Sequence, residues 1–173
     1  PRQMPRIVEA TARGDVVEDL LYLDPRTGDP IACQDEIPFF AAQRRTILSR
    51  AEQVDPIRIY NYIDAGGYAP LARLLQRGEP GWIVDQVKVS GLRGRGGAGF
   101  LTGKKWELLA GQPGRDKVLI CNADEGDPGA YMDRSVLEGT PHSVIEGMLI
   151  GALGTGATRG VIYVRAEYPV AIK

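Results

Sequence analysis

Apolar residues recur at helical spacing through the middle of the chain. They stand at positions 83, 84 and 87 of the segment 82–90, which favours a helix over an alternating strand. Leu71, Leu74 and Leu75 mark one face of a helix over 68–76. Before it, Asp55-Pro56 offers an N-cap residue and a proline at the first helical position. We therefore predict a helix from Asp55 and a second over 68–76, paired as a hairpin.

Two later segments also have helical patterns. The segment 102–110 has an apolar face that includes Trp106, which we expect to pack in the core. The segment 140–153 begins with Thr140 as a capping residue. Its glycines at 147 and 151 permit close packing against a sheet, because a residue without a Cβ lets another element approach.

Two short apolar, β-favouring runs, 117–121 and 160–165, predict buried strands, and 168–173 begins a further helix. Strands alternating with helices predict an α/β fold. We expect a Rossmann-like αβα sandwich with a partly parallel sheet, right-handed crossovers and an incomplete C-terminal end.

The first 54 residues differ from the rest. Residues 5–13 and 15–22 predict a short amphipathic helix and a turn, and prolines and glycines follow. Residues 43–48 are expected to be an extended segment that packs on the following domain. We predict an irregular, partly helical connector over 1–54 and a ligand-binding domain over 55–173.

Composition restricts the function classes. The chain has 173 residues, 43% of them hydrophobic, and a net charge of −1, which favours neither nucleic-acid nor membrane-surface binding. No apolar run reaches the length needed to cross a bilayer, and the first residues do not resemble a signal peptide. Cys33 and Cys121 are far apart, so we expect no disulfide and no cluster ligation, in keeping with a cytoplasmic protein.

Glycines concentrate in the segment 90–100. Gly94, Gly96 and Gly99 satisfy a G-x-G-x-x-G spacing, and Gly97 adds a fourth residue whose backbone a ring or phosphate can approach closely. Free amide groups in such a loop suit an anion, and nearby Arg93, Arg95, Lys104 and Lys105 add positive charge. The dinucleotide fingerprint needs a preceding strand, which the pattern does not predict here. By itself the loop is either a structural turn or a nucleotide site.

Polar residues follow the first predicted strand. Asn122, Asp124, Glu125 and Asp127 come directly after it, and ligands of open α/β sheets bind at that end of the strands. Three ionised acids so close repel one another unless a neighbouring group donates hydrogen bonds to them. The alternative is a solvated acidic turn closed by Pro128-Gly129.

Together these motifs resemble the NADH-binding flavoprotein subunit of respiratory complex I and the diaphorase subunits of NAD-linked hydrogenases and formate dehydrogenases. The resemblance rests on Ser90-Gly-Leu-Arg-Gly-Arg-Gly-Gly-Ala-Gly-Phe100, Thr102-Gly-Lys-Lys-Trp106, Cys121-Asn-Ala-Asp-Glu125, Asp133-Arg134, Pro141-His142, Ile145-Glu-Gly-Met148 and Tyr163-Val-Arg-Ala-Glu-Tyr168. It covers well over half of the chain.

The resemblance implies that FMN lies on the glycine loop and accepts a hydride from NADH. It implies that Gly94, Arg95, Gly96, Gly97, Gly99 and Lys105 line the flavin, that Asn122, Asp124 and Glu125 bond its ring or ribityl chain, and that Phe100 and Asp127 lie beside NADH. Many complex I members have Glu where Asp127 stands, and Leu108 replaces a second aromatic residue of some relatives. No side chain is assigned as a catalytic residue or metal ligand, and His142, Asp133 and Arg134 are expected to be structural.

The resemblance also implies a longer parent protein with a second glycine loop and a 4Fe–4S domain beyond Lys173. That parent would pass electrons singly to iron–sulfur clusters. Its partners would be a thioredoxin-like 2Fe–2S subunit and hydrogenase, formate dehydrogenase or complex I subunits, with any membrane association through them. We expect this part alone to be inactive. Two alternatives stay open: a non-catalytic dinucleotide- or phosphate-binding domain, and a structural adaptor without cofactor.

Overall fold

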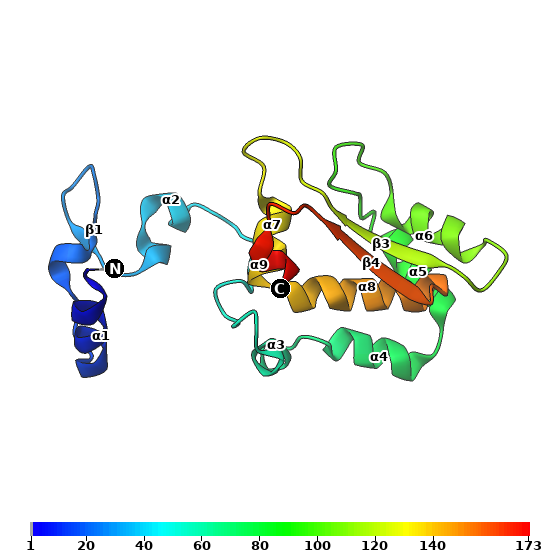
Figure 1. The fold of residues 1–173 in the computed structure, drawn as a ribbon, viewed down its shortest axis with the longest axis horizontal. Helices are drawn as coiled ribbons and strands as arrows, with labels where there is room; N and C mark the ends of the chain where they lie inside the picture. Colours follow the sequence, from blue (N-terminus) through cyan, green and yellow to red (C-terminus); the bar gives the residue numbers. More distant parts are fainter. Residues whose placement is uncertain (1) are drawn as a thin grey trace. The chain divides into compact units, whose positions relative to one another are not determined.

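The chain folds into two compact units, one that ends at Arg45 and one from Thr46 to Lys173. The structure, a computed structural model, describes residues 2–173 (Figure 1). The predicted boundary between 54 and 55 remains a prediction.

The N-terminal unit contains short elements. The predicted amphipathic helix is α1 (Met4–Arg13), which ends at Gly14 with a left-handed φ of 77°. The predicted turn within 15–22 contains a single 3-10 turn, η1 (Glu18–Leu20). Four elements were not predicted: the antiparallel strands β1 (Tyr22–Leu23) and β2 (Pro30–Ile31), and the helical turns η2 (Gln34–Glu36) and α2 (Pro38–Ala41).

Four helices precede the sheet of the second unit: α3 (Ile59–Asp64), α4 (Ala69–Arg77), α5 (Pro80–Val89) and α6 (Thr102–Ala110). The last three confirm the helical patterns. The prediction that a helix begins at Asp55 is wrong. The Asp55 carboxylate accepts a hydrogen bond from the amide of Ile57 at 3.1 Å and its carbonyl accepts one from the amide of Arg58 at 3.1 Å, so a single turn forms. The extended backbone of Arg58, with φ −119° and ψ 99°, ends this turn before α3 begins at Ile59. Leu75, expected on an apolar face, is 59% exposed.

The sheet consists of β3 (Val118–Ala123) and β4 (Arg159–Val164), which pair in parallel with Val118 opposite Arg159 and Ala123 opposite Val164. Helices α7 (Met132–Gly139) and α8 (Pro141–Thr155) connect them, and α9 (Pro169–Ile172) follows. The α/β class and the parallel pairing are confirmed (Figure 1). The αβα sandwich itself stays a prediction.

Helix α8 packs on the strands and on α6. A Cβ at Gly151 would lie 2.9 Å from the Leu119 side chain and 3.0 Å from Trp106, so this glycine allows the close approach that the sequence predicted. Gly147 does not, because nothing lies within 4 Å of its Cβ position. Trp106 is confirmed as a packing residue.

The strands are less buried than predicted. Ile120 is 64% exposed, Val161 47% and Tyr163 59%. These residues alternate along the strands with Leu119 and Gly160. Leu119 lies beside Gly151 of α8, and Gly160 lies beside Met148 of the same helix. Successive side chains point to opposite faces of a sheet, so α8 covers one face while these three residues lie on the other. The prediction of two fully buried strands is therefore wrong for this face.

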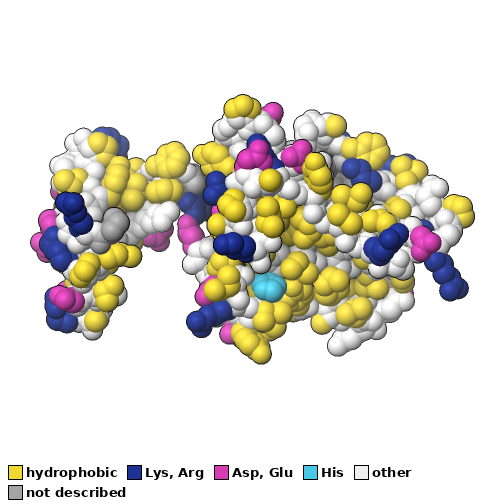
Figure 2. All heavy atoms as spheres, in the orientation of Figure 1, with side chains coloured by type: hydrophobic (Ala, Val, Ile, Leu, Met, Phe, Trp, Pro, Cys, Tyr) yellow, Lys and Arg dark blue, Asp and Glu magenta, His cyan; other side chains and the backbone are white. Residues whose placement is uncertain are grey.

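A buried carboxylate ties α8 to the preceding helices. Glu146 is 5% exposed and accepts hydrogen bonds from the Tyr62 hydroxyl at 2.7 Å and from the amides of Tyr68 and Leu71 at 3.0 and 3.3 Å. His142 contributes to the same contact, because its Nδ1 lies 2.9 Å from the Tyr68 hydroxyl. Figure 2 shows this histidine, coloured cyan, among apolar side chains. Its position agrees with the structural role expected for it.

The start of α8 differs in detail from the prediction. Thr140 stands at the N-cap position, but its hydroxyl makes no capping hydrogen bond to the helix. It donates instead to the Val136 carbonyl at 3.3 Å and accepts from the Ser143 hydroxyl at 3.2 Å. The position of the helix start was right, and the capping role of Thr140 was wrong, because its hydroxyl bonds back to the Val136 carbonyl of α7, which also accepts the Thr140 amide at 2.8 Å.

Candidate functional site

The glycine loop (residues 93–101) and the acidic loop (residues 122–131) form opposite walls of one cavity. Its volume is about 470 Å³. The predicted residues that line it are Arg95, Gly96, Gly97, Asp124, Glu125 and Asp127, joined by Gly126, Ala130, Met132 and Asp133. Two motifs separated in the sequence by the whole of α6 thus meet in space.

The base of the glycine loop is closed by backbone hydrogen bonds. The Gly94 amide donates to the Phe100 carbonyl at 2.8 Å, and the Thr102 amide donates to the Leu92 carbonyl at 2.9 Å. The Arg93 side chain adds a bond to the Gly99 carbonyl at 2.9 Å. These bonds hold the two ends of the loop together, so its tip projects as a short hairpin.

The tip of the loop exposes its backbone. Gly97 has a φ of +104° and Gly99 of +61°, conformations that other residues adopt only with strain. A Cβ built at Gly96 or Gly97 would meet nothing within 4 Å. Among the described residues, the amides of 95–99 have no hydrogen-bond partner. The tip therefore offers free N–H donors beside the cavity.

Five of the predicted site residues do not line the cavity: Gly94, Gly99, Phe100, Lys105 and Asn122. Phe100 is 49% exposed, and the Lys105 ammonium lies 5.8 Å from the centre of its ring. Asn122 accepts a hydrogen bond from the Asp124 amide at 3.1 Å, which shapes the turn after β3. These residues belong to the glycine loop, to α6 and to the end of β3, outside the lining of the cavity.

Glu125 is held firmly in the acidic loop. Its carboxylate accepts hydrogen bonds from the amides of Asp133 at 3.1 Å and Arg134 at 3.4 Å, in the first turn of α7, and from the Tyr168 hydroxyl at 3.1 Å. Its backbone carbonyl accepts a bond from Arg165. The predicted structural role of Asp133 and Arg134 thus has a concrete form, in which their backbone amides hold Glu125.

The environment of Glu125 decides its charge. Partial burial raises the pKa of the Glu125 carboxyl, but the amide donors of α7 and the Tyr168 hydroxyl outweigh burial and bring this pKa below its ordinary value. Burial and the nearby Glu125 raise the pKa of Asp133. The surroundings therefore favour the ionised form of Glu125 and disfavour that of Asp133.

The two walls have complementary chemistry. The glycine loop offers amide donors and the Arg95 guanidinium, whose Nη1 already donates to the Arg93 carbonyl. The acidic loop offers the carboxylates of Asp124 and Asp127, for which the described residues supply no hydrogen-bond donor. An anion suits the first wall and a hydroxyl-rich group suits the second. A ligand with both groups fits this cavity.

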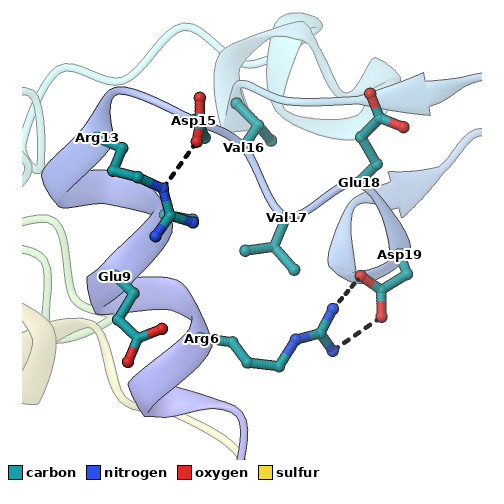
Figure 3. A pocket seen from close by; sticks show the side chains of 9 residues that line it. Arg6, Glu9, Arg13, Asp15, Val16, Val17, Glu18 and Asp19 are labelled. Atoms are coloured by element: carbon teal, nitrogen blue, oxygen red, sulfur yellow. Dashed lines mark hydrogen bonds and ion pairs between the residues drawn. The ribbon is translucent and has the colours of Figure 1, made fainter.

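A larger hollow, of about 710 Å³, lies in the N-terminal unit (Figure 3). Its walls come from α1 and the segment 15–19, where Arg6 pairs with Asp19 at 2.7 Å and Arg13 with Asp15 at 3.1 Å. In each ion pair the two charged side chains are exposed, and each charge already has a partner of opposite sign. No predicted site residue lines this hollow. The cavity between the glycine loop and the acidic loop is therefore the better candidate for the functional site, although it is smaller.

Residues 2–173 contain neither a cluster of metal-ligating side chains nor a membrane-spanning helix. No group of three or more His, Cys, Asp or Glu side chains in that range could hold a metal ion. No helix in it is long and apolar enough to span a membrane.

Comparisons with known proteins give the family. The family model described as the Nuo51 FMN-binding domain matches residues 87–173. The chain is 58% identical over 120 residues to the HndC subunit of the NADP-reducing hydrogenase of Solidesulfovibrio fructosivorans, covering 69% of this chain and 24% of that protein. It is 46% identical over 114 residues to a subunit of the NADH-quinone oxidoreductase of Escherichia coli, covering 65% and 26%.

A solved structure shares the fold. The NAD+-reducing [NiFe]-hydrogenase in its air-oxidised state aligns with 99% of this chain and 26% of its own, at a TM-score of 0.59 and 26% identity. The chain thus spans about a quarter of the length of the proteins it matches. The family match includes both walls of the cavity, so the chain belongs to the Nuo51 FMN-binding domain family.

Proposed function

We propose that this chain is the FMN-binding part of an oxidoreductase subunit that takes electrons from NADH. One observation carries the proposal: the glycine loop and the acidic loop meet across a cavity of about 470 Å³. Both loops lie in the part of the chain that matches the Nuo51 FMN-binding domain. FMN, when bound, supplies the chemistry, since it accepts a hydride from a nicotinamide and releases electrons singly.

The residues present fit FMN. Its phosphate needs donors, which the free amides of 95–99 and Arg95 provide. Its ribityl hydroxyls need acceptors, which Asp124 and Asp127 provide. The open space at the Cβ positions of Gly96 and Gly97 lets a flat ring approach the backbone. A solvated acidic turn or a simple structural turn would not require this combination.

The residues around the cavity have proposed roles as well. Lys105 adds positive charge near the glycine loop, Asn122 shapes the turn that carries Asp124, and Phe100 offers an aromatic face to NADH. Gly94 closes the base of the glycine loop, and Gly99 supplies its positive φ. The chain itself binds and orients, and none of these side chains is proposed to transfer a proton.

The partners follow from the same family. We propose that electrons leave toward iron–sulfur clusters, including a 4Fe–4S cluster of the parent protein and a thioredoxin-like 2Fe–2S subunit. The relatives are subunits of an NADP-reducing hydrogenase and of NADH-quinone oxidoreductases. We place the parent in the cytoplasm, at the membrane only through partner subunits.

An absorbance experiment tests the proposal. The protein that carries this sequence is purified, incubated with FMN and freed of unbound flavin, and its visible spectrum is recorded before and after anaerobic addition of NADH. We expect a bound flavin spectrum that bleaches with NADH. A protein that binds NADH without flavin would instead be a dinucleotide-binding domain, and one that binds neither would be an adaptor.

A further inference from the structure

The segment 165–168, which follows β4, contacts the acidic loop from outside the cavity. Tyr168 is 6% exposed, and its hydroxyl donates to Oε2 of Glu125 at 3.1 Å. The Arg165 guanidinium donates to the Glu125 backbone carbonyl. Neither residue lines the cavity. The side chain and the backbone of Glu125 are thus both held by the segment 165–168, which begins 40 residues later in the sequence.

The two residues are themselves fixed. The guanidinium groups of Arg134 and Arg165 lie over the Tyr168 ring, 5.4 and 5.5 Å from its centre. Glu167 pairs with Arg165 at 3.1 Å. Cation–π contacts and this ion pair limit the movement of the phenol, so its hydroxyl stays aimed at Glu125.

Glu125 joins this segment to α7. The carboxylate that accepts the Tyr168 hydroxyl also accepts the amides of Asp133 and Arg134. Asp124 and Asp127 stand one residue before and two residues after Glu125, and both line the cavity. A shift of Glu125 would therefore move the acceptors that face the ligand.

We propose that Arg165 and Tyr168 are positioning residues, which hold Glu125 and thereby set the acidic loop at its distance from the glycine loop. The inference rests on the proposed function, because it takes FMN as the ligand of the cavity. Neither residue touches the ligand. Their effect on binding passes through Glu125.

The test removes one hydroxyl. Tyr168→Phe keeps the ring under both guanidinium groups and deletes the hydroxyl, which donates to Glu125 at 3.1 Å and lies 3.5 Å from the Ala130 carbonyl. Tyr60→Phe is the matched control, since Tyr60 lies in α3 and is 77% exposed. For each protein we would measure amide hydrogen exchange at Asp133 and Arg134, the FMN dissociation constant by flavin fluorescence, and Tm.

Tyr168→Phe should speed exchange at the two amides and raise the FMN dissociation constant about fivefold, the loss of one hydrogen bond to a charged acceptor. Tyr60→Phe should change neither. In a Glu125→Ala background the Tyr168 substitution should add little further loss of FMN affinity, because the carboxylate that the hydroxyl holds is then absent and only its longer contact with the Ala130 carbonyl remains. Arg165→Met removes the donor to the Glu125 backbone carbonyl and should also raise the FMN dissociation constant.

Other results would overturn the inference. Unchanged FMN affinity and exchange in Tyr168→Phe, a lower Tm without weaker FMN binding, or full additivity with Glu125→Ala would each do so. Absence of FMN binding by the unsubstituted protein would overturn the proposed function instead. In that case exchange at the two amides still decides whether Tyr168 holds Glu125.

Discussion

The two walls of the cavity are held in different ways. The glycine loop is closed by backbone hydrogen bonds at its base, and its tip leaves the amides of 95–99 without partners among the described residues. The acidic loop is held by side chains, because Glu125 binds the first turn of α7 and accepts from Tyr168. One wall offers its backbone to a ligand, and the other uses side chains both to bind and to stay in place.

This difference separates two kinds of sensitivity. In the glycine loop, an added Cβ matters more than a lost functional group, since the loop works through backbone N–H groups. In the acidic loop, losing one carboxylate leaves several donors unpaired at once. Substitutions in the first wall should therefore weaken binding, and substitutions at Glu125 should also weaken the fold.

The largest effect is expected for Glu125→Ala. It leaves the amides of Asp133 and Arg134 and the Tyr168 hydroxyl without their acceptor, so the free energy of unfolding should fall by about 2 kcal/mol. Glu138→Ala is the control on the same helix, because Glu138 makes only an ion pair with Arg134 at 3.0 Å, worth about 0.5 kcal/mol. Urea denaturation measures both. Equal losses would mean that Glu125 does not fix its wall.

Gly97→Ala tests the other wall. The added methyl group stands on a residue that lines the cavity, so FMN affinity should fall about tenfold. Gly114→Ala is the control, since Gly114 has a similar φ of +96° and open space at its Cβ but lies outside the cavity. Both variants should lose similar stability from backbone strain. Equal FMN affinity in the two would argue against a ligand on the glycine loop.

Phe100→Leu tests whether Phe100, which lies on the glycine loop outside the cavity, contributes to NADH binding. Loss of the aromatic face should raise KM for NADH about fivefold, while FMN content stays the same. Steady-state kinetics with an artificial acceptor and the flavin absorbance give the two values. Phe39→Leu, at a 70% exposed position of α2, is the control and should change neither. A loss of FMN in Phe100→Leu would place Phe100 at the flavin.

The smallest effect is a pH dependence. The pKa of Glu125 is lowered in the folded protein, so its ionised form stabilises the fold above the ordinary pKa of glutamate, about 4.3, and this contribution is lost as the pH falls through the lowered value. The wild-type protein should exceed Glu125→Gln in stability by about 1 kcal/mol near pH 7. The difference should shrink at acidic pH. A difference that grows on acidification would contradict the direction of the pKa shift.

Much of the architecture could be read from local sequence patterns. Helices α4, α5, α6 and α8 and both long strands lie where apolar spacing predicts them, since periodicity reports which side of an element is covered. The helix expected at Asp55 failed, because the turn that begins there ends at Arg58, whose backbone is extended. The prediction that both strands are buried failed on one face of the sheet, because the sequence of a strand does not show whether another element covers each of its faces.

The sequence by itself determined the chemistry of the two loops: glycines able to take a positive φ, cations beside them, and carboxylates after a strand. Only the tertiary structure decided which of these residues share a cavity, leaving Phe100, Lys105 and Asn122 around it. It also decided that Glu125 binds Tyr168 and that Glu146 binds Tyr62, contacts between residues 43 and 84 positions apart. Local spacing reports the periodicity of one element, whereas hydrogen bonds between distant segments depend on how those elements pack.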